Sequence, residues 1–211
     1  EYMIPVGEDT PQPSGSNVFQ DVHVLVQASK DGTEVGFDVD HDGVPDTVID
    51  SDLNGSPDAY EVVIDAGEST QLFHVPAGAK IISSEPVQVQ LITGDDSNYE
   101  CRGFSLTPDI LRTNDYYCPV DSQGGNAPTD IYLYNPNASD IDVKYDFTGG
   151  GDPDGTISIP AFTAVSFRIK TGNYLPDSGA IHLYTDSYNE KFWGIGVADT
   201  GIGLDPRDVP R

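Results

Sequence analysis

The chain has 211 residues and a formal net charge of −25, because 35 Asp and Glu face only 10 Lys and Arg. A chain this acidic repels nucleic acid and anionic membranes, which excludes the basic binding surfaces that proteins use for both. Its 22 Gly and 16 Pro, with one Met and one Trp, favour short strands and turns over long helices. No stretch approaches the roughly 20 apolar residues that span a bilayer. We therefore expect partners that are neither nucleic acids nor membrane interiors.

The first 16 residues carry Pro, Gly, Ser and acidic side chains and are predicted to form an extended arm. An apolar run within this arm consists of Tyr2, Met3, Ile4 and Val6, with Pro5 between them. Such a run can add a strand to the exposed sheet edge of a neighbouring subunit, although Pro5 limits the pairing. We expect this arm to hold copies of the chain together in an open homopolymer.

Residues 17–98 are predicted to form a first β-sandwich, because apolar and polar residues alternate in short runs separated by turns. The predicted strands are residues 21–27, 33–39, 60–65, 69–75, 80–83 and 87–93. Turns such as Ala66-Gly67-Glu68 and Pro76-Ala77-Gly78 separate them.

Two acidic loops interrupt this run of strands, and the second repeats the first at a period of 12 residues. Alternate carboxylates on a turning loop supply the six to eight oxygens that Ca²⁺ prefers, and a Gly at the sixth position allows the sharp turn. The predicted ligands in the first loop are Asp38, Asp40, Asp42, the Val44 carbonyl and Asp46; those in the second are Asp50, Asp52, Asn54, the Ser56 carbonyl, Asp58 and Glu61. The second loop fits the full calcium-loop pattern, whereas Ile49 stands where the first needs its closing acid.

The residues beside the loops favour strands, not the two helices of a helix–loop–helix calcium hand. The tandem loops therefore resemble the Asp-rich repeats of thrombospondin-type and dockerin-type modules. The alternative, a solvated acidic turn in an acidic protein, stays open from the sequence alone.

The two cysteines, Cys101 and Cys118, predict one disulfide in an oxidising compartment, which would stabilise the fold by roughly 3 kcal/mol in the chain-entropy model. Two free thiols are the alternative. The chain opens at Glu1, as expected of a mature extracellular protein whose leader has been removed. The sequons at Asn137 and Asn54 predict N-glycosylation, with Asn137 favoured because Asn54 is also a predicted calcium ligand.

The second half of the chain follows the plan of the first. Residues 130–134, 140–146, 156–160, 178–183 and 192–197 match strands of the first half in order and pattern. We therefore predict an all-β fold of two tandem β-sandwich, jelly-roll-like units, an internal duplication. The predicted segments are the arm at 1–16, a sandwich at 17–98, a disulfide-containing connector at 99–126, a second sandwich at 127–200 and a tail at 201–211.

Several sequence motifs in the middle of the chain resemble those of a known family. They are a predicted strand from Glu85-Pro-Val-Gln-Val into Thr93-Gly-Asp95, followed by Tyr99-Glu-Cys, Asn114-Asp-Tyr-Tyr-Cys118 and Thr129-Asp-Ile-Tyr-Leu-Tyr-Asn135. Together they resemble the β-rich N-terminal domain of IgGFc-binding-type proteins, in the form found in secreted surface proteins of archaea and bacteria. The resemblance implies an extracellular surface, adhesion or matrix role and transfers no active-site residue.

No catalytic signature stands out in the sequence. His23, His74 and His182 fall within strand patterns, and neither a nucleophile elbow nor a phosphate loop is present. We therefore expect a non-enzymatic cell-surface protein, the subunit of a calcium-stabilised extracellular filament or sheath. Two alternatives stay open: a monomeric, calcium-dependent adhesion or glycan-binding module, and, less favoured, a hydrolase that uses some pair of carboxylates.

Overall fold

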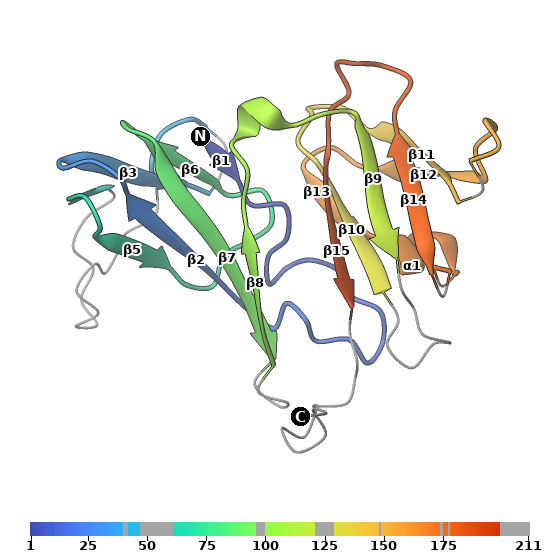
Figure 1. The fold of residues 1–211 in the computed structure, drawn as a ribbon, viewed down its shortest axis with the longest axis horizontal. Coiled ribbons are helices and arrows are strands. Elements are labelled where there is room, and N and C mark those ends of the chain that lie inside the picture. Colours follow the sequence, from blue (N-terminus) through green and yellow to red (C-terminus); the bar gives the residue numbers. More distant parts are fainter. Residues whose placement is uncertain are drawn as a thin grey trace. The chain divides into compact units, whose positions relative to one another are not determined.

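The computed structural model describes residues 1–39, 42–46, 61–95, 100–120, 129–147, 149–173, 175–176 and 178–198. Within them the chain is mostly β, in four small antiparallel sheets, so the predicted all-β class is confirmed (Figure 1). The chain divides into two compact units. The first draws on residues 1–9, 19–94 and 101–112, and the second on residues 10–18, 95–100 and those from 113 onward.

The first unit contains two sheets of four strands each. One sheet has the order β1 (Tyr2–Met3), β6 (Lys80–Ser83), β3 (Thr33–Asp38), β4 (Glu61–Ile64). The other has the order β5 (Ser69–Leu72), β2 (Asp21–Ala28), β7 (Val87–Asp95), β8 (Glu100–Ser105), and a short 3₁₀ helix, η1 (Asp109–Leu111), follows β8. Strand β2 shows why these segments are strands: Val22, Val24 and Val26 are buried, and the residues between them face away from the core.

The second unit contains a four-stranded and a three-stranded sheet. The orders are β9 (Asp115–Val120), β14 (Gly179–Tyr184), β11 (Ile141–Asp146), β12 (Gly155–Ile159), and β13 (Thr163–Ser166), β10 (Thr129–Asn135), β15 (Trp193–Ala198). Leu133 of one sheet and Ile157 and Ile181 of the other lie in one buried cluster, so the two sheets share a core in a sandwich-like arrangement. One turn of helix, α1 (Phe167–Thr171), begins at Ser166, whose side chain accepts a hydrogen bond from Ile169 N.

The two units repeat one strand order. The order β1-β6-β3-β4 with β5-β2-β7 in the first unit corresponds to β9-β14-β11-β12 with β13-β10-β15 in the second. The register repeats as well, because Asp38 pairs with Lys80 where Asp146 pairs with His182. The strands correspond in the order that the sequence predicts, and β8 has no counterpart among the described residues of the second unit. This repetition supports the interpretation of an internal duplication.

The N-terminal segment does not form the predicted free arm. Tyr2 pairs with Ile81 of β6, and the Tyr2 hydroxyl donates to the Val87 carbonyl at 2.5 Å. The side chains of Ile4 and Val6 are fully buried, and Met3 is buried as well. The prediction that Tyr2, Met3, Ile4 and Val6 act as an assembly arm is therefore wrong for this structure. The physical reason is that burial within the same chain gains the same apolar contact without the entropy cost of association.

The predicted connector at 99–126 contains strands of both units, and the predicted disulfide is absent. Cys101 lies on β8 in the first unit and is exposed, whereas Cys118 lies on β9 in the second unit and is half-buried. Both are free thiols. The sequence count of two cysteines did not reveal that the two thiols belong to different units.

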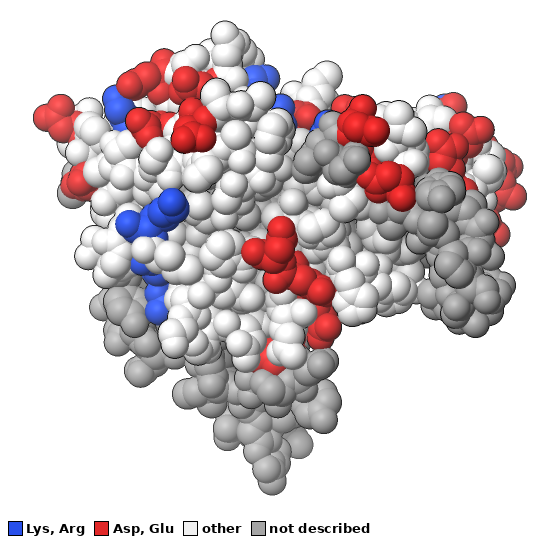
Figure 2. All heavy atoms as spheres, turned by 180° about the vertical axis from the view of Figure 1, so that it is seen from behind, with Lys and Arg blue, Asp and Glu red and all other residues white. Residues whose placement is uncertain are grey.

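The surface carries the charge that the composition requires. On the face in Figure 2, red acidic atoms gather in several groups and blue basic atoms are few. Lys30 with Glu85 and Lys144 with Asp186 show that some of the scarce cations pair with carboxylates. Among the described residues, no helix has both the length and the apolarity that a membrane crossing needs.

Candidate metal centre

The first acidic loop starts at the buried end of β3. Asp38 is 0% exposed, and its Oδ2 accepts a hydrogen bond from Gly43 N at 3.1 Å. Asp46 closes the loop, because its Oδ2 accepts from Val39 N at 3.1 Å and its own N–H donates to the Phe37 carbonyl at 3.0 Å. Gly43 has φ +87, in the left-handed region that a side chain would disfavour. The first and ninth positions of the loop thus form its frame.

The remaining predicted ligands divide into described and undescribed residues. Asp42 is exposed and its Oδ1 accepts from Val44 N at 2.8 Å, Val44 is exposed, and Glu61 begins β4 with an exposed side chain. Asp40, Asp50, Asp52, Asn54, Ser56 and Asp58 lie outside the described residues. The structure therefore shows how the first loop is closed, and calcium coordination stays a prediction.

The loop after β11 in the second unit repeats the contacts that close the first loop. Asp146 Oδ1 accepts from Gly149 N at 2.8 Å, at the fourth position of its loop, whereas Asp38 accepts from Gly43 N, at the sixth. Asp154 Oδ2 accepts from Phe147 N at 2.7 Å, and Asp154 N donates to the Tyr145 carbonyl at 2.8 Å. Gly151, which corresponds to Gly43, has φ +92. Both loops read D-x4-G-x-P-D.

The two loops carry their remaining carboxylates at different positions. The first has Asp40 and Asp42 at its third and fifth positions, where the second has Thr148 and Gly150, and the second has Asp152 at its seventh position, where the first has Val44. The second loop closes between Asp146 and Asp154 without carboxylates at the third and fifth positions, so this closure does not require them, although Asp42 accepts from Val44 N in the first loop. Neighbouring carboxylates on one loop repel each other unless a cation compensates them.

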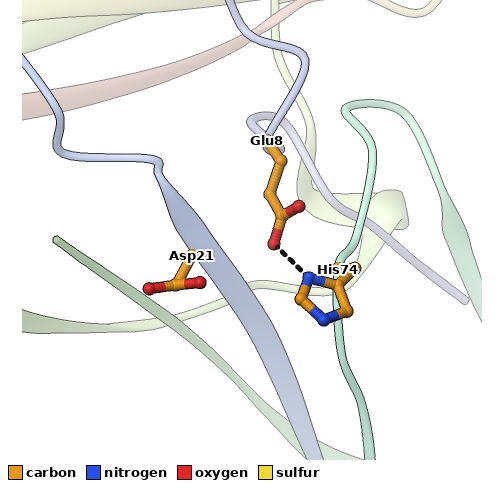
Figure 3. Close-up of side chains that lie close together, drawn as sticks. All are labelled: Glu8, Asp21 and His74. Atoms are coloured by element: carbon orange, nitrogen blue, oxygen red, sulfur yellow. Dashed lines mark hydrogen bonds and ion pairs between the residues drawn. The ribbon is translucent and has the colours of Figure 1, made fainter. Parts of the chain in front are cut away.

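A second group of potential metal ligands lies in the first unit, where the sequence did not predict one. Glu8, Asp21 and His74 place one ligand atom each within 4.8 Å of the others (Figure 3). The Glu8 carboxylate points at the His74 ring, with 3.0 Å between Glu8 Oε1 and His74 Nδ1. Glu8 follows the N-terminal segment, Asp21 begins β2, and His74 lies in the turn after β5 with φ +55. Glu8 and His74 are 66 residues apart, so no local spacing signals the group.

The outer face of the second unit carries a row of stacked rings. The Tyr117 and His182 rings lie 4.3 Å apart at 2° between their planes, and the His182 and Tyr184 rings lie 4.6 Å apart at 24°. His182 Nε2 lies 3.1 Å from Asp115 Oδ1. Tyr117 is 72% exposed. An exposed aromatic beside a carboxylate is a surface that a sugar ring can stack on.

Asp130, on β10, is a buried carboxyl with a structural role. Ser166 Oγ donates to its Oδ2 at 2.6 Å, and the N–H groups of Ile131 and Arg168 donate to its Oδ1 at 2.8 and 3.1 Å. Burial raises the pKa of Asp130 above its ordinary value, against these hydrogen bonds and the Arg168 charge, which lower it. Asp130 thereby joins β10 to the start of α1.

The predicted glycosylation site at Asn137 lies in the turn after β10, half-buried. Its Nδ2 donates to Asn135 Oδ1 at 2.7 Å and to the Lys191 carbonyl at 2.8 Å. A glycan on Nδ2 would replace one of these donors, so a modified Asn137 would lose a hydrogen bond. Asn54 lies outside the described residues, and glycosylation of both sequons stays a prediction.

No family model, no curated protein and no solved structure matches the chain. The resemblance to the IgGFc-binding-type domain therefore stays a prediction.

Proposed function

We propose that this chain is a calcium-stabilised, non-enzymatic structural protein of the extracellular surface. The observation that supports the proposal is the closed frame of the first acidic loop, in which Asp38 and Asp46 fix the turn, together with the Asp40 and Asp42 carboxylates that the sequence adds at its third and fifth positions. Calcium loops of extracellular modules bind with dissociation constants of about 10⁻⁴ to 10⁻³ M, which suits calcium outside the cell. With the disulfide absent, the loops are the main support for an extracellular location.

In this proposal, calcium holds the connection between β3 and β4. The strands are the same in both units, but the connection spans residues 39–60 in the first unit and only 147–154 in the second. A longer connection costs more chain entropy to close, and bound calcium offsets that cost by cross-linking carboxylates along it. The sheet β1-β6-β3-β4 then presents a rigid edge instead of a loose loop.

Calcium binding is tested by isothermal titration of the chelator-treated protein with Ca²⁺. The double variant Asp40→Ala/Asp42→Ala removes the two carboxylates that the corresponding loop of the second unit lacks at these positions, and we expect it to bind one calcium fewer than the wild type. Asp152→Ala, in the corresponding loop of the second unit, is the matched control and should bind as the wild type does. Equal binding by all three proteins would show that the first loop holds no calcium.

Assembly into a filament or sheath is the further part of this proposal. Since the N-terminal segment is buried in the first unit, contacts between copies have to use other surfaces. Negative-stain electron microscopy of the protein with calcium, and again after chelation, tests this. Filaments that loosen on chelation would support the proposal, and single particles under both conditions would leave a structural protein that does not polymerise by itself.

A second candidate function, a glycan-binding module, is favoured by the stacked rings of Tyr117, His182 and Tyr184. A sugar ring can stack on the exposed Tyr117 while Asp115 accepts hydrogen bonds from its hydroxyls. A glycan array compares the wild type with Tyr117→Ala and with Tyr188→Ala, whose side chain is equally exposed at 72% but stacks on neither His182 nor Tyr184. Binding lost only in Tyr117→Ala would establish this function, and an array without signal would exclude it for the glycans tested.

A further inference from the structure

We propose that Glu8, Asp21 and His74 bind a divalent transition-metal ion of the zinc class, at a site separate from the calcium loops. This inference does not rest on the proposed function. It rests on three ligand atoms of two kinds, from three segments far apart in sequence, that lie within 4.8 Å of one another (Figure 3).

The spacing of the ligand atoms fits a small ion. Nitrogen and oxygen ligands lie about 2.0 to 2.2 Å from zinc, so neighbouring ligands of a tetrahedral site lie roughly 3.3 Å apart. Glu8 Oε1 and His74 Nδ1, at 3.0 Å, are already at about this separation. Asp21 needs only a side-chain rotation to approach, because it begins β2 and its side chain is half-buried, not packed in the core.

The ligand types select the class of metal. An imidazole nitrogen with two carboxylate oxygens suits zinc, and related ions such as manganese or cobalt, whereas calcium prefers six to eight oxygens and no nitrogen. Three protein ligands leave a position for water or for an added ligand. The His74 side chain is 74% exposed and that of Glu8 is 28% exposed, so an ion can enter from solvent.

Two hydrogen bonds of Glu8 join the three segments that carry the proposed ligands. Glu8 N donates to the Val75 carbonyl at 3.0 Å, next to His74, and Glu8 Oε1 accepts from Val22 N at 3.2 Å, next to Asp21. Asp21 and His74 are thus each one residue from a backbone group that bonds to Glu8. An ion at this site would fasten the N-terminal segment to β2 and to the turn after β5.

His23 lies close to the group without belonging to it. Its ring centroid is 6.5 Å from that of His74, and it packs edge-on against Phe73 at 4.5 Å. The Phe73 contact occupies one side of the His23 ring. We therefore assign three protein ligands, and a change at His23 should alter the affinity less than a change at His74.

The experiment titrates metal-free protein with Zn²⁺ and with Co²⁺ in buffer that contains excess Ca²⁺, which keeps the calcium loops saturated. Co²⁺ bound by nitrogen and oxygen ligands in a four-coordinate site gives a visible absorption band, which reports the ligands directly. We expect one ion per chain in the wild type and binding at least tenfold weaker in His74→Asn. Asparagine suits the left-handed backbone at this position, so the variant should fold.

Matched controls make the result specific. His182→Asn removes a histidine that also lies beside a carboxylate, Asp115, and should leave zinc and cobalt binding unchanged. Glu8→Gln should weaken binding as His74→Asn does. The proposal is overturned if the wild type shows no cobalt band, or if His74→Asn and Glu8→Gln bind both ions as the wild type does. Either result leaves the calcium measurement unaffected, since that uses different residues.

Discussion

Asn135 and Asn137 hold the turn after β10 in one hydrogen-bond network. Asn135 Oδ1 accepts from both the backbone N–H and the side-chain amide of Asn137, at 2.9 and 2.7 Å. Asn135 Nδ2 lies 2.9, 3.0 and 3.1 Å from the carbonyls of Ser139, Ile159 and Pro160. Asn135 is fully buried, so its amide joins this turn to the end of β12 where water cannot replace it.

Asn135→Ala should therefore destabilise the protein by about 2 to 4 kcal/mol, because it removes the partner of the Ile159 carbonyl and of the Asn137 backbone N–H. The measurement is the free energy of unfolding in urea. Asn173→Ala, at an exposed asparagine with one local side-chain bond to Thr171, is the control and should change stability by less than about 0.5 kcal/mol. Similar losses in the two variants would contradict the network.

The raised pKa of Asp130 predicts a specific dependence of stability on pH. The folded chain holds the Asp130 proton more tightly than the unfolded chain does. The protonated Asp130 therefore contributes to the free energy of unfolding in full below the ordinary aspartate pKa, and this contribution is lost as the pH rises through the raised folded pKa. Relative to Asp130→Asn, the wild type should thus lose stability as the pH rises above about 4. Urea unfolding of both proteins over a pH series measures this, and a wild type that gains on the variant with rising pH would contradict it.

Gly7→Ala tests whether the N-terminal segment is seated in its own unit. A Cβ at this position would lie 2.2 Å from backbone atoms of Pro76 and Ala77, which cannot move aside as a side chain can. We expect a loss of about 3 kcal/mol and faster hydrogen exchange in residues 2–8.

Gly103→Ala is the control for this substitution, because the added Cβ would meet only the end of the flexible Gln90 side chain at 3.3 Å. It should cost much less than Gly7→Ala. If Gly7→Ala unfolds at the same urea concentration as the wild type, the segment does not occupy this place in solution.

The two free thiols predict distinct reactivities. With the thiol reagent DTNB and no reductant, the exposed Cys101 should react quickly and the half-buried Cys118 slowly, because burial raises the pKa of the Cys118 thiol and lowers its thiolate fraction. Cys101→Ser isolates the slow phase, which should speed up as the pH rises. Two thiols should react per chain after unfolding. If none reacts, the two cysteines are joined by the predicted disulfide.

The sequence predicts the strands well because their signal is local. Alternation such as Val22, Val24 and Val26 shows both the strand and its buried face, and it recurs in both halves. The acidic loops are also local, since their pattern lies within a few residues, and the structure confirms the turn that Gly43 allows.

Sequence patterns do not predict contacts between residues that are far apart in the chain. The apolar run from Tyr2 to Val6 could bind either a neighbouring subunit or its own chain. In the structure it pairs with β6, and the sequence does not show that this edge of β6 is available to it. The cluster of Glu8 with His74 depends on the path of the chain in the same way. Pairing of Cys101 with Cys118 was inferred from the number of cysteines and the expected compartment, and neither shows whether the two thiols meet in the fold.

We propose that calcium stabilises this fold through its first acidic loop. The most direct test is the melting temperature of the intact chain in excess calcium and after chelation, for the wild type and for Asp40→Ala/Asp42→Ala. One site at 100 times its dissociation constant contributes about 2.7 kcal/mol, which corresponds to roughly 5 to 10 °C for a chain of this size. We predict that chelation lowers the melting temperature of the wild type by at least this amount and that of the double variant by clearly less. A melting temperature that chelation leaves unchanged in the wild type would contradict the account.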